Sequence, residues 1–146
     1  VIDADALNLV ASSEDLQRAL PKNAILTPHP KELERLIGKW SDDLDRQAKA
    51  KEFAKKHKII LVLKGAFTMI TDGDHFWVNS TGNPALATAG SGDVLTGVIT
   101  GLLSQGYTPL NAAIVGVYIH GKAADTYVRN TKKSTMIASD IIDFLS

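Results

Sequence analysis

Short apolar runs alternate along the chain with segments of helical periodicity. Residues 24–27 and 59–63 are apolar at almost every position, which predicts buried strands, because a strand covered on both faces carries few polar side chains. Apolar residues three and four apart predict helices over 31–37 and 45–56. Strand followed by helix is the repeating theme, so we predict one α/β domain over residues 1–146, with helices on both faces of a mostly parallel sheet.

An antiparallel hairpin is predicted near the middle of the chain. Residues 67–71 and 75–79 have the composition of strands, and Asp72-Gly73-Asp74 between them is a good turn signal. We expect this hairpin to form an antiparallel edge of the sheet.

Three helices are predicted in the second half. The apolar positions of residues 93–105 share one helical face, and the small residues of a second face would let another backbone approach closely. Thr108-Pro109 is an N-cap followed by a first helical residue, and it predicts a helix that runs to about Val128. Ser139 or Asp140 is expected to cap a last helix.

Composition narrows the class of protein. The chain has 146 residues, 45% of them apolar and 22% charged, which is typical of one globular domain. Lys plus Arg equal Asp plus Glu at 16 each, so no net field favours nucleic acid or an anionic membrane, and we expect neither partner. The lack of cysteine excludes disulfides, thiol nucleophiles and Cys-based zinc sites, and is compatible with a reducing cytoplasm. No apolar run reaches membrane-spanning length.

The first residues predict that sequence is missing upstream. Val1-Ile2 runs into Asp3-Ala4-Asp5 without an initiator Met, and two apolar residues are too few for the buried strand that they end. We therefore expect this chain to be part of a longer domain.

Residues 89–97 carry the strongest sign of chemistry. Gly90 and Gly92 leave backbone N–H groups unshielded, and the helix that follows adds its unpaired N–H groups and the positive end of its dipole, which together bind anions. Asp93 beside a phosphate suits a base that takes a proton from a hydroxyl next to the phosphoryl group. The local sequence supports equally well an ordinary helix start, with Ser91 or Asp93 as the N-cap.

Two more polar groups follow predicted strands. His29 lies between two prolines that stiffen its backbone, which suits hydrogen bonding to a substrate or phosphate; the alternative is a histidine that caps a local turn. Lys64 ends an apolar strand and can neutralise a phosphate, with Gly65 admitting a nucleotide close to the main chain; the alternative is a surface lysine. Ligands of open α/β sheets lie beyond the carboxyl ends of strands, so we expect these groups and residues 90–93 to converge.

The spacing of other residues excludes several sites. No two histidines lie four apart with a Glu between them, which argues against a zinc hydrolase, and no protein metal site is predicted. GxGxxG and GxxxxGK[ST] are absent, which counts against a Rossmann site or a P-loop.

Six segments occur in an order and spacing that one family shares. They are Asp3-Ala4-Asp5-Ala6-Leu7-Asn8, Thr27-Pro28-His29-Pro30-Lys31-Glu32, Lys64-Gly65-Ala66-Phe67-Thr68, Gly82-Asn83-Pro84, residues 89–97 and His120-Gly121. The chain thereby resembles the ADP/ATP-dependent NAD(P)H-hydrate dehydratases, a branch of the ribokinase-like superfamily. Only the glycine–Asp helix start is general to that superfamily, so the segments that begin at Thr27 and Lys64 carry the narrower assignment.

The resemblance implies a ribokinase-like fold and an activity in metabolite repair. ADP, or ATP, with Mg²⁺ would phosphorylate the hydroxyl of NADH or NADPH that has become hydrated on the nicotinamide ring (NADHX and NADPHX). Phosphate would then leave, giving NAD(P)H, AMP and phosphate. The resemblance also implies a cytoplasmic homo-oligomer, a tetramer.

The same resemblance assigns roles to residues. Asp93 would be the catalytic base and contact the hydrate, and His29 would bind the hydrated dinucleotide. The anion hole would be formed by Gly90, Ser91 and Gly92. ADP or AMP would be bound by Lys64, Gly65, Ala66, Phe67, Thr68 and Gly92.

The chain departs from the family in two ways. It has Ala89-Gly90-Ser91-Gly92-Asp93 where the family usually has Gly-Gly-Thr-Gly-Asp, and the family's catalytic domain is nearly twice as long. We therefore expect the carboxyl-terminal half of that domain. Two alternatives stay open: a ribokinase-like kinase of a hydroxymethylpyrimidine, thiazole alcohol or sugar, which would keep a phosphorylated product, and an ADP/ATP-binding module without turnover.

Overall fold

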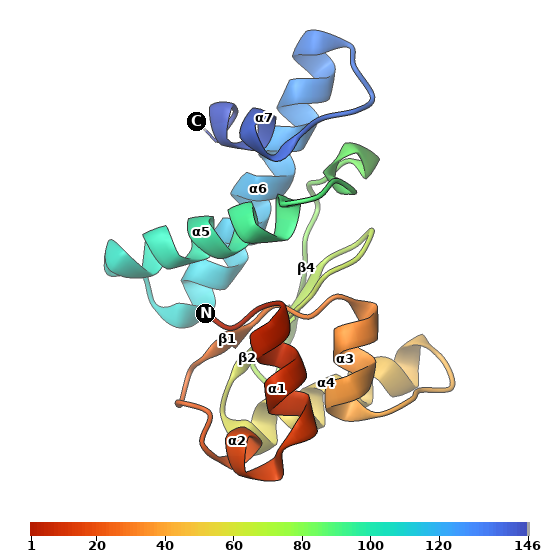
Figure 1. Cartoon of the computed structure of the whole chain (residues 1–146), viewed down its shortest axis with the longest axis vertical. Helices are drawn as coiled ribbons and strands as arrows, with labels where there is room; N and C mark the ends of the chain where they lie inside the picture. The colour runs from red at the N-terminus through yellow and green to blue at the C-terminus, as the bar shows by residue number, and fades with distance from the viewer. Residues whose placement is uncertain (146) are drawn as a thin grey trace. The chain divides into compact units, whose positions relative to one another are not determined.

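The computed structural model describes residues 1–145, which form two compact units. The first unit is Val1–Val78, and the second begins at Asn79. Figure 1 shows the course of the chain through both. That the two units belong to a single domain over 1–146 stays a prediction.

The first unit is built on a four-stranded sheet with the order β1-β2-β3-β4. The strands are β1 (Ile25–Leu26), β2 (Ile60–Leu63), β3 (Met69–Thr71) and β4 (Phe76–Val78). β1 and β2 are parallel, and Ile2 adds a parallel bridge to Leu26. β2, β3 and β4 pair antiparallel, with Asp72-Gly73-Asp74 between β3 and β4, which confirms the predicted hairpin. The sheet of this unit is thus mixed.

Four helices accompany this sheet. They are α1 (Asp5–Ser12), α2 (Glu14–Arg18), α3 (Pro30–Ile37) and α4 (Asp43–His57). The predicted helices over 31–37 and 45–56 are confirmed. α4 begins two residues early because the side chain of Asp42 caps it, accepting a hydrogen bond from the backbone N–H of Asp45. α3 ends at Ile37, and its C-cap, Gly38, has a φ of 80° that suits glycine.

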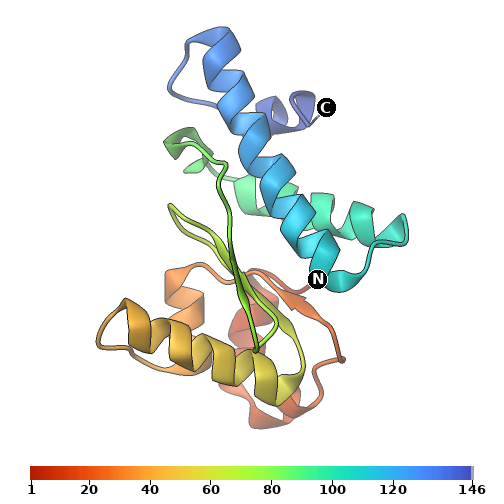
Figure 2. The same ribbon diagram turned by 180° about the vertical axis from the view of Figure 1, so that it is seen from behind.

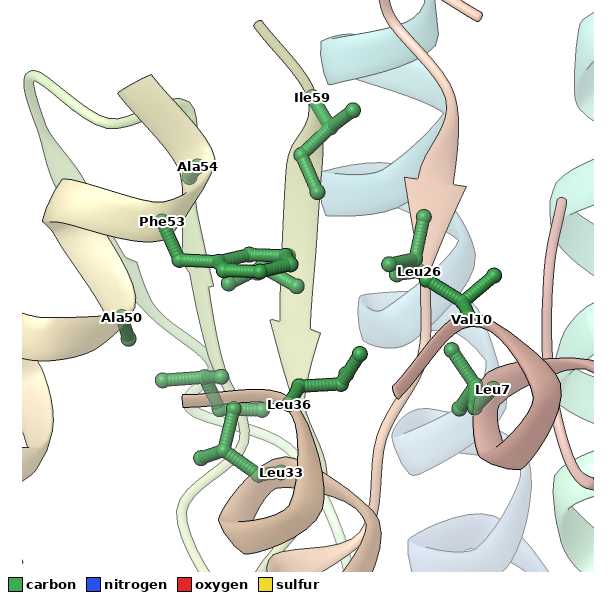
Figure 3. Packing of buried hydrophobic residues seen from close by; sticks show 11 residues of the cluster. Leu7, Val10, Leu26, Leu33, Leu36, Ala50, Phe53, Ala54 and Ile59 are labelled. Atoms are coloured by element: carbon green, nitrogen blue, oxygen red, sulfur yellow. The ribbon is translucent and has the colours of Figure 1, made fainter. Parts of the chain in front are cut away.

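A single apolar cluster fixes α1, α3 and α4 on the sheet. Figure 3 shows Phe53 of α4 lying across β2 and Val10 of α1 beside Leu26 of β1, and Leu36 of α3 belongs to the same cluster. These side chains are all under a tenth exposed. Their burial positions the loops at the carboxyl ends of β1 and β2, because each loop begins where a buried strand ends.

The second unit is helical among its described residues. It contains the 3₁₀ helix η1 (Pro84–Leu86) and the helices α5 (Ser91–Ser104), α6 (Pro109–Thr131) and α7 (Ala138–Asp143). Figure 2 shows α6 as a long helix with α5 crossing it. Thr108 caps α6 by accepting from the backbone N–H of Asn111, as the sequence predicts. None of the helices within residues 1–145 is long and apolar enough to cross a membrane.

α5 and α6 approach each other closely at a glycine. A Cβ added to Gly116 would lie 2.7 Å from Cγ1 of Ile99, so only glycine fits there without movement. The expected close approach on the small-residue face of α5 is not found among the described residues, since nothing lies within 4 Å of the Cβ positions of Gly97 and Gly101. The close contact therefore depends on a small residue of α6 and not of α5.

The starts of two helices differ from the prediction. α5 begins at Ser91 with Gly90 as its N-cap, so neither Ser91 nor Asp93 caps it. α7 begins at Ala138 with Ile137 as its N-cap, and Asp140 accepts a hydrogen bond from the backbone N–H of Ile137 at 2.8 Å. In both cases the polar residues lie inside the first turn and not before it.

Candidate active site

Lys64 pairs with Asp3 at the carboxyl end of β2. Its Nζ lies 2.9 Å from Oδ1 of Asp3, and the two side chains are 22% and 12% exposed. The backbone N–H of Lys64 also donates to the carbonyl of Pro28 at 3.0 Å. The segments that follow β1 and β2 are thus joined, and Lys64 is a partly buried ion-pair partner instead of the surface lysine of the alternative interpretation.

Asp3 keeps its negative charge although it is partly buried. Burial alone would raise the pKa of its carboxyl group, but hydrogen bonds from Lys64, from the Ala4 backbone and from Thr27, with the charge of Lys64, lower the pKa below the ordinary 3.8. Ala4, next in the chain, has a φ of 51°, in the left-handed region that favours glycine. Strained backbone of this kind is typical of functional sites.

His29 is the N-cap of α3. Its Nδ1 accepts hydrogen bonds from the backbone N–H groups of Lys31, at 3.1 Å, and Glu32, at 3.3 Å. The Glu32 carboxylate accepts in return from the His29 backbone N–H at 2.8 Å, which completes a capping box. The capping alternative is therefore realised. The same bonds place the proton of a neutral ring on Nε2, which lies 3.4 Å from Glu32 Oε1.

Residues 65–68 form an exposed turn between β2 and β3. Gly65 and Ala66 are exposed, and Phe67 is 77% exposed, which is unusual for so large an apolar side chain. Oγ1 of Thr68 donates to the carbonyl of Gly65 at 3.3 Å and closes the turn. An open aromatic face beside a small-residue turn can stack on a flat ligand.

The start of α5 has a backbone conformation that needs glycine. Gly90 has a φ of 82° and makes no side-chain cap, and a Cβ there would lie 3.1 Å from Cβ of Ala138. The backbone N–H of Ser91 donates to the carbonyl of Thr88 at 3.3 Å, and Gly90 has no side chain that could cap the N–H groups after it. With the positive end of the helix dipole, this turn favours an anion.

Asp93 and Ser91 lie in the first turn of α5 but in different environments. Asp93 is exposed, so its carboxylate is accessible to a substrate. Ser91 is buried, and both its carbonyl oxygen and its Oγ lie within 3.3 Å of Nε2 of His120 in α6. The turn thus has one exposed acid, Asp93, and one buried residue, Ser91, that is hydrogen-bonded to α6.

Two residues of this arrangement are missing from the sequence prediction. Asp3 and His120 both belong to segments quoted for the family resemblance, but the sequence assigns neither a role. The sequence did carry a signal for His120. It is followed by Gly121 on a strongly apolar helix, and a histidine buried there needs a hydrogen-bond partner.

Each unit brings together one part of the predicted site. The first unit gathers His29, Lys64 and the 65–68 turn beyond the ends of β1 and β2, and the second gathers residues 90–93 at the start of α5. That the two parts face one ligand stays a prediction.

The described residues offer no ready-made metal centre. Nowhere in residues 1–145 do three His, Cys, Asp or Glu side chains gather closely enough to hold an ion. Mg²⁺ is often bound through substrate phosphates, waters and one or two carboxylates. An Mg²⁺ ion bound in that mode would need no cage of protein ligands.

Comparison with solved structures defines the class of protein. A ribokinase-like superfamily protein from Enterococcus faecalis is 29% identical, with a TM-score of 0.77 over 99% of this chain and 49% of that one. The chain therefore has a ribokinase-like α/β fold, as predicted.

Comparison with sequences then defines the family. The family model described as NAD(P)H-hydrate dehydratase matches residues 1–146, and the chain belongs to this family. An ADP-dependent (S)-NAD(P)H-hydrate dehydratase from Neisseria meningitidis is 43% identical over 97% of this chain and 48% of that protein. A Bacillus subtilis ADP/ATP-dependent NAD(P)H-hydrate dehydratase, crystallised with ATP and Mg²⁺, is 37% identical with a TM-score of 0.77, over 98% of this chain and 51% of that one. The chain spans about half the length of these relatives.

Proposed function

We propose that the protein is an ADP-dependent (S)-NAD(P)H-hydrate dehydratase. One observation carries the proposal: the first turn of α5 combines a left-handed glycine cap with an exposed Asp93, in a chain that belongs to the NAD(P)H-hydrate dehydratase family. The turn supplies N–H groups for a phosphoryl group, and the carboxylate supplies a base beside it.

The reaction begins at the hydroxyl of the hydrated nicotinamide. Asp93 takes the hydroxyl proton, the hydroxyl oxygen bonds to the terminal phosphorus of ADP, and the bond from that phosphorus to AMP breaks. The phosphorylated hydrate then loses phosphate, which takes the hydroxyl oxygen with it, and a ring proton leaves to restore the dihydronicotinamide. The sum is hydrate plus ADP giving NAD(P)H, AMP and phosphate.

The transferring phosphoryl group needs fixed donors more than a covalent partner. The backbone N–H groups of Gly90, Ser91 and Gly92 would surround its oxygens as negative charge spreads over them. Glycine at two of the three positions lets the phosphoryl group approach the backbone.

The nucleotide and the dinucleotide would be held by the first unit. ADP would be bound by Lys64, by the turn of Gly65, Ala66, Phe67 and Thr68, and by Gly92. Its AMP portion would stay there as the product. His29 would bind the hydrated dinucleotide. Mg²⁺ would arrive bound to the nucleotide phosphates.

The family resemblance also supports a cytoplasmic homo-oligomer, a tetramer, as part of this proposal. Sedimentation of the purified protein measures the subunit number. A monomer at working concentrations would remove that part of the proposal and leave the chemistry in place.

An enzyme assay on protein purified from its natural source tests the proposal. The intact mass is measured first, so that the polypeptide assayed is known. Recovery of dihydronicotinamide absorbance from NADHX, dependent on ADP, supports the dehydratase. ADP consumption with a stable phosphorylated product would show a kinase instead, and ADP binding without consumption would show a binding module.

A further inference from the structure

A buried histidine of α6 holds the first turn of α5. His120 is 7% exposed, and its Nε2 lies 3.0 Å from the carbonyl oxygen of Ser91 and 3.3 Å from the Oγ of the same residue. A carbonyl oxygen can only accept, so Nε2 carries the proton and donates it. Ser91 is itself 8% exposed, so the hydrogen bond is shielded from water.

This bond acts on the orientation of the next N–H group. The carbonyl of Ser91 and the N–H of Gly92 belong to one planar peptide unit and point in opposite directions. Holding the carbonyl therefore fixes the direction of the Gly92 N–H. The bond matters at this point because Gly90 and Gly92 flank Ser91, and glycine leaves the backbone more conformations than any other residue.

His120 is well placed to hold Ser91 because its own position on α6 is fixed. The neighbouring Gly121 packs against Thr81, so closely that an added Cβ would lie 2.8 Å from the Thr81 carbonyl carbon. Oγ1 of Thr81 donates to the carbonyl of Tyr118 at 2.8 Å. Asp125, one turn farther along α6, accepts from the backbone N–H of Gly82 at 2.9 Å. α6 is thus tied to the segment around residue 81 by contacts on either side of His120.

We infer that His120 is a positioning residue of the anion hole: through Ser91, it orients the peptide unit whose Gly92 N–H faces the transferring phosphoryl group. The inference rests on the proposed function for the identity of that anion. His120 acts through the backbone of Ser91, so its effect belongs to the phosphoryl transfer step and not to proton removal.

Two substitutions of His120 and one control separate this role from a structural one. In His120→Gln the side-chain amide can donate from about the place of Nε2, and in His120→Leu no donor remains. His57→Leu removes a second imidazole, which is partly buried in α4 and whose Nε2 has no hydrogen-bond partner among the described residues. We expect His120→Leu to lower kcat about 10-fold to 100-fold, with a much smaller change in KM for ADP, because a slight misplacement of transition-state donors has effects of this size. His120→Gln restores most of the rate, and His57→Leu keeps the wild-type kcat.

Equal kcat in wild type and His120→Leu would overturn the inference. So would equal losses in both His120 variants that track the folded fraction in thermal melts, because that is the result of a purely structural role.

NMR decides the inference even if the wild-type protein turns over no hydrate, a result that refutes the proposed function alone. ¹⁵N spectra then read the His120 tautomer, and titration with AMP reads the Gly92 amide. A proton on Nε2, and an AMP-induced shift of Gly92 that is lost in His120→Leu but kept in His120→Gln, support the inference. A proton on Nδ1 alone, or the same response to AMP in all three proteins, overturns it.

Discussion

At the scale of single residues, Asp93 is the group on which the proposed chemistry depends most. It is exposed in the first turn of α5, so a substrate hydroxyl can reach its carboxylate. A base of this kind contributes about 10²-fold to 10⁴-fold to the rate. We therefore expect Asp93→Asn to lower kcat by about that factor and to leave the Kd for ADP nearly unchanged, as measured by steady-state kinetics and calorimetry.

The exposed Asp143 of α7 supplies a matched control for Asp93. Asp143→Asn makes the same chemical change outside the proposed site and should leave both constants at their wild-type values. Loss of ADP affinity in Asp93→Asn, to the same degree as loss of rate, would contradict the role of a base.

The Asp3–Lys64 pair is expected to stabilise the first unit at neutral pH. The pKa of Asp3 is lowered in the folded protein, so its contribution is present above pH 3.8 and is lost as the pH falls through the folded pKa. Asp3→Asn should lower the free energy of unfolding by about 1–3 kcal/mol at pH 7 and by less at pH 2, because at pH 7 it leaves the Lys64 ammonium group partly buried without its counter-charge. Urea unfolding at the two pH values measures this, and an equal effect at both would contradict the ion pair.

His57 gives the free energy of unfolding a second pH dependence, which begins nearer to neutral pH than that of Asp3. Burial lowers its pKa below 6.5, a hydrogen bond with the Gln17 backbone opposes this, and the charge of Lys56 lowers it further. A folded pKa below the unfolded one means that stability is greatest above pH 6.5 and falls as the pH drops through the folded value. His57→Leu should remove this part of the decline between pH 7 and 5 in urea unfolding. The same slope in wild type and variant would show that His57 does not titrate on unfolding.

At the scale of elements, the packing of α5 on α6 depends on Gly116. A Cβ at Gly116 would lie 2.7 Å from Cγ1 of Ile99, so Gly116→Ala should destabilise the protein by about 1–3 kcal/mol through overpacking. Gly101→Ala is the matched control, because nothing described lies within 4 Å of its Cβ position. It should stabilise α5 by up to about 1 kcal/mol through helix propensity. Thermal unfolding distinguishes the two, and a Gly116→Ala variant as stable as wild type would contradict the close approach.

The elements could be predicted well where the signal is local. The apolar run of β2, the helical periodicity of α3 and the Thr108-Pro109 start of α6 each depend on a few neighbouring residues, and all are present in the structure. The start of α5 could not be predicted in the same way. Its N-cap is Gly90 and not the predicted Ser91 or Asp93. Ser91 is hydrogen-bonded to His120, which lies 29 residues later in the chain.

The candidate site could be predicted only in part for the same reason. Lys64 is recognisable at a strand end, but its partner Asp3 lies 61 residues earlier, and hydrophobic periodicity carries no information on such a pair. His29 is recognisable between its prolines, but its role as the N-cap of α3 includes a reciprocal hydrogen bond with Glu32. A residue pattern can suggest such a bond, and only the structure establishes it.

At the scale of the whole molecule, the chain has a family's motifs within about half of its relatives' length. The strand-end groups of the first unit and the helix start of the second are each organised by contacts within their own unit. The proposed function requires in addition that the groups of both units bind the same ligand. We expect ADP to change NMR resonances of Phe67 and of Gly92 with one common Kd, and two different Kd values would contradict a single nucleotide site.

The central claim is tested most directly by the stoichiometry of products from one sample of NADHX and ADP. The account predicts that each NADH restored, measured by its absorbance, is accompanied by one AMP and one phosphate, measured by ³¹P NMR. A phosphorylated organic product that accumulates with no NADH would contradict the account and assign the protein to the kinases of the same fold.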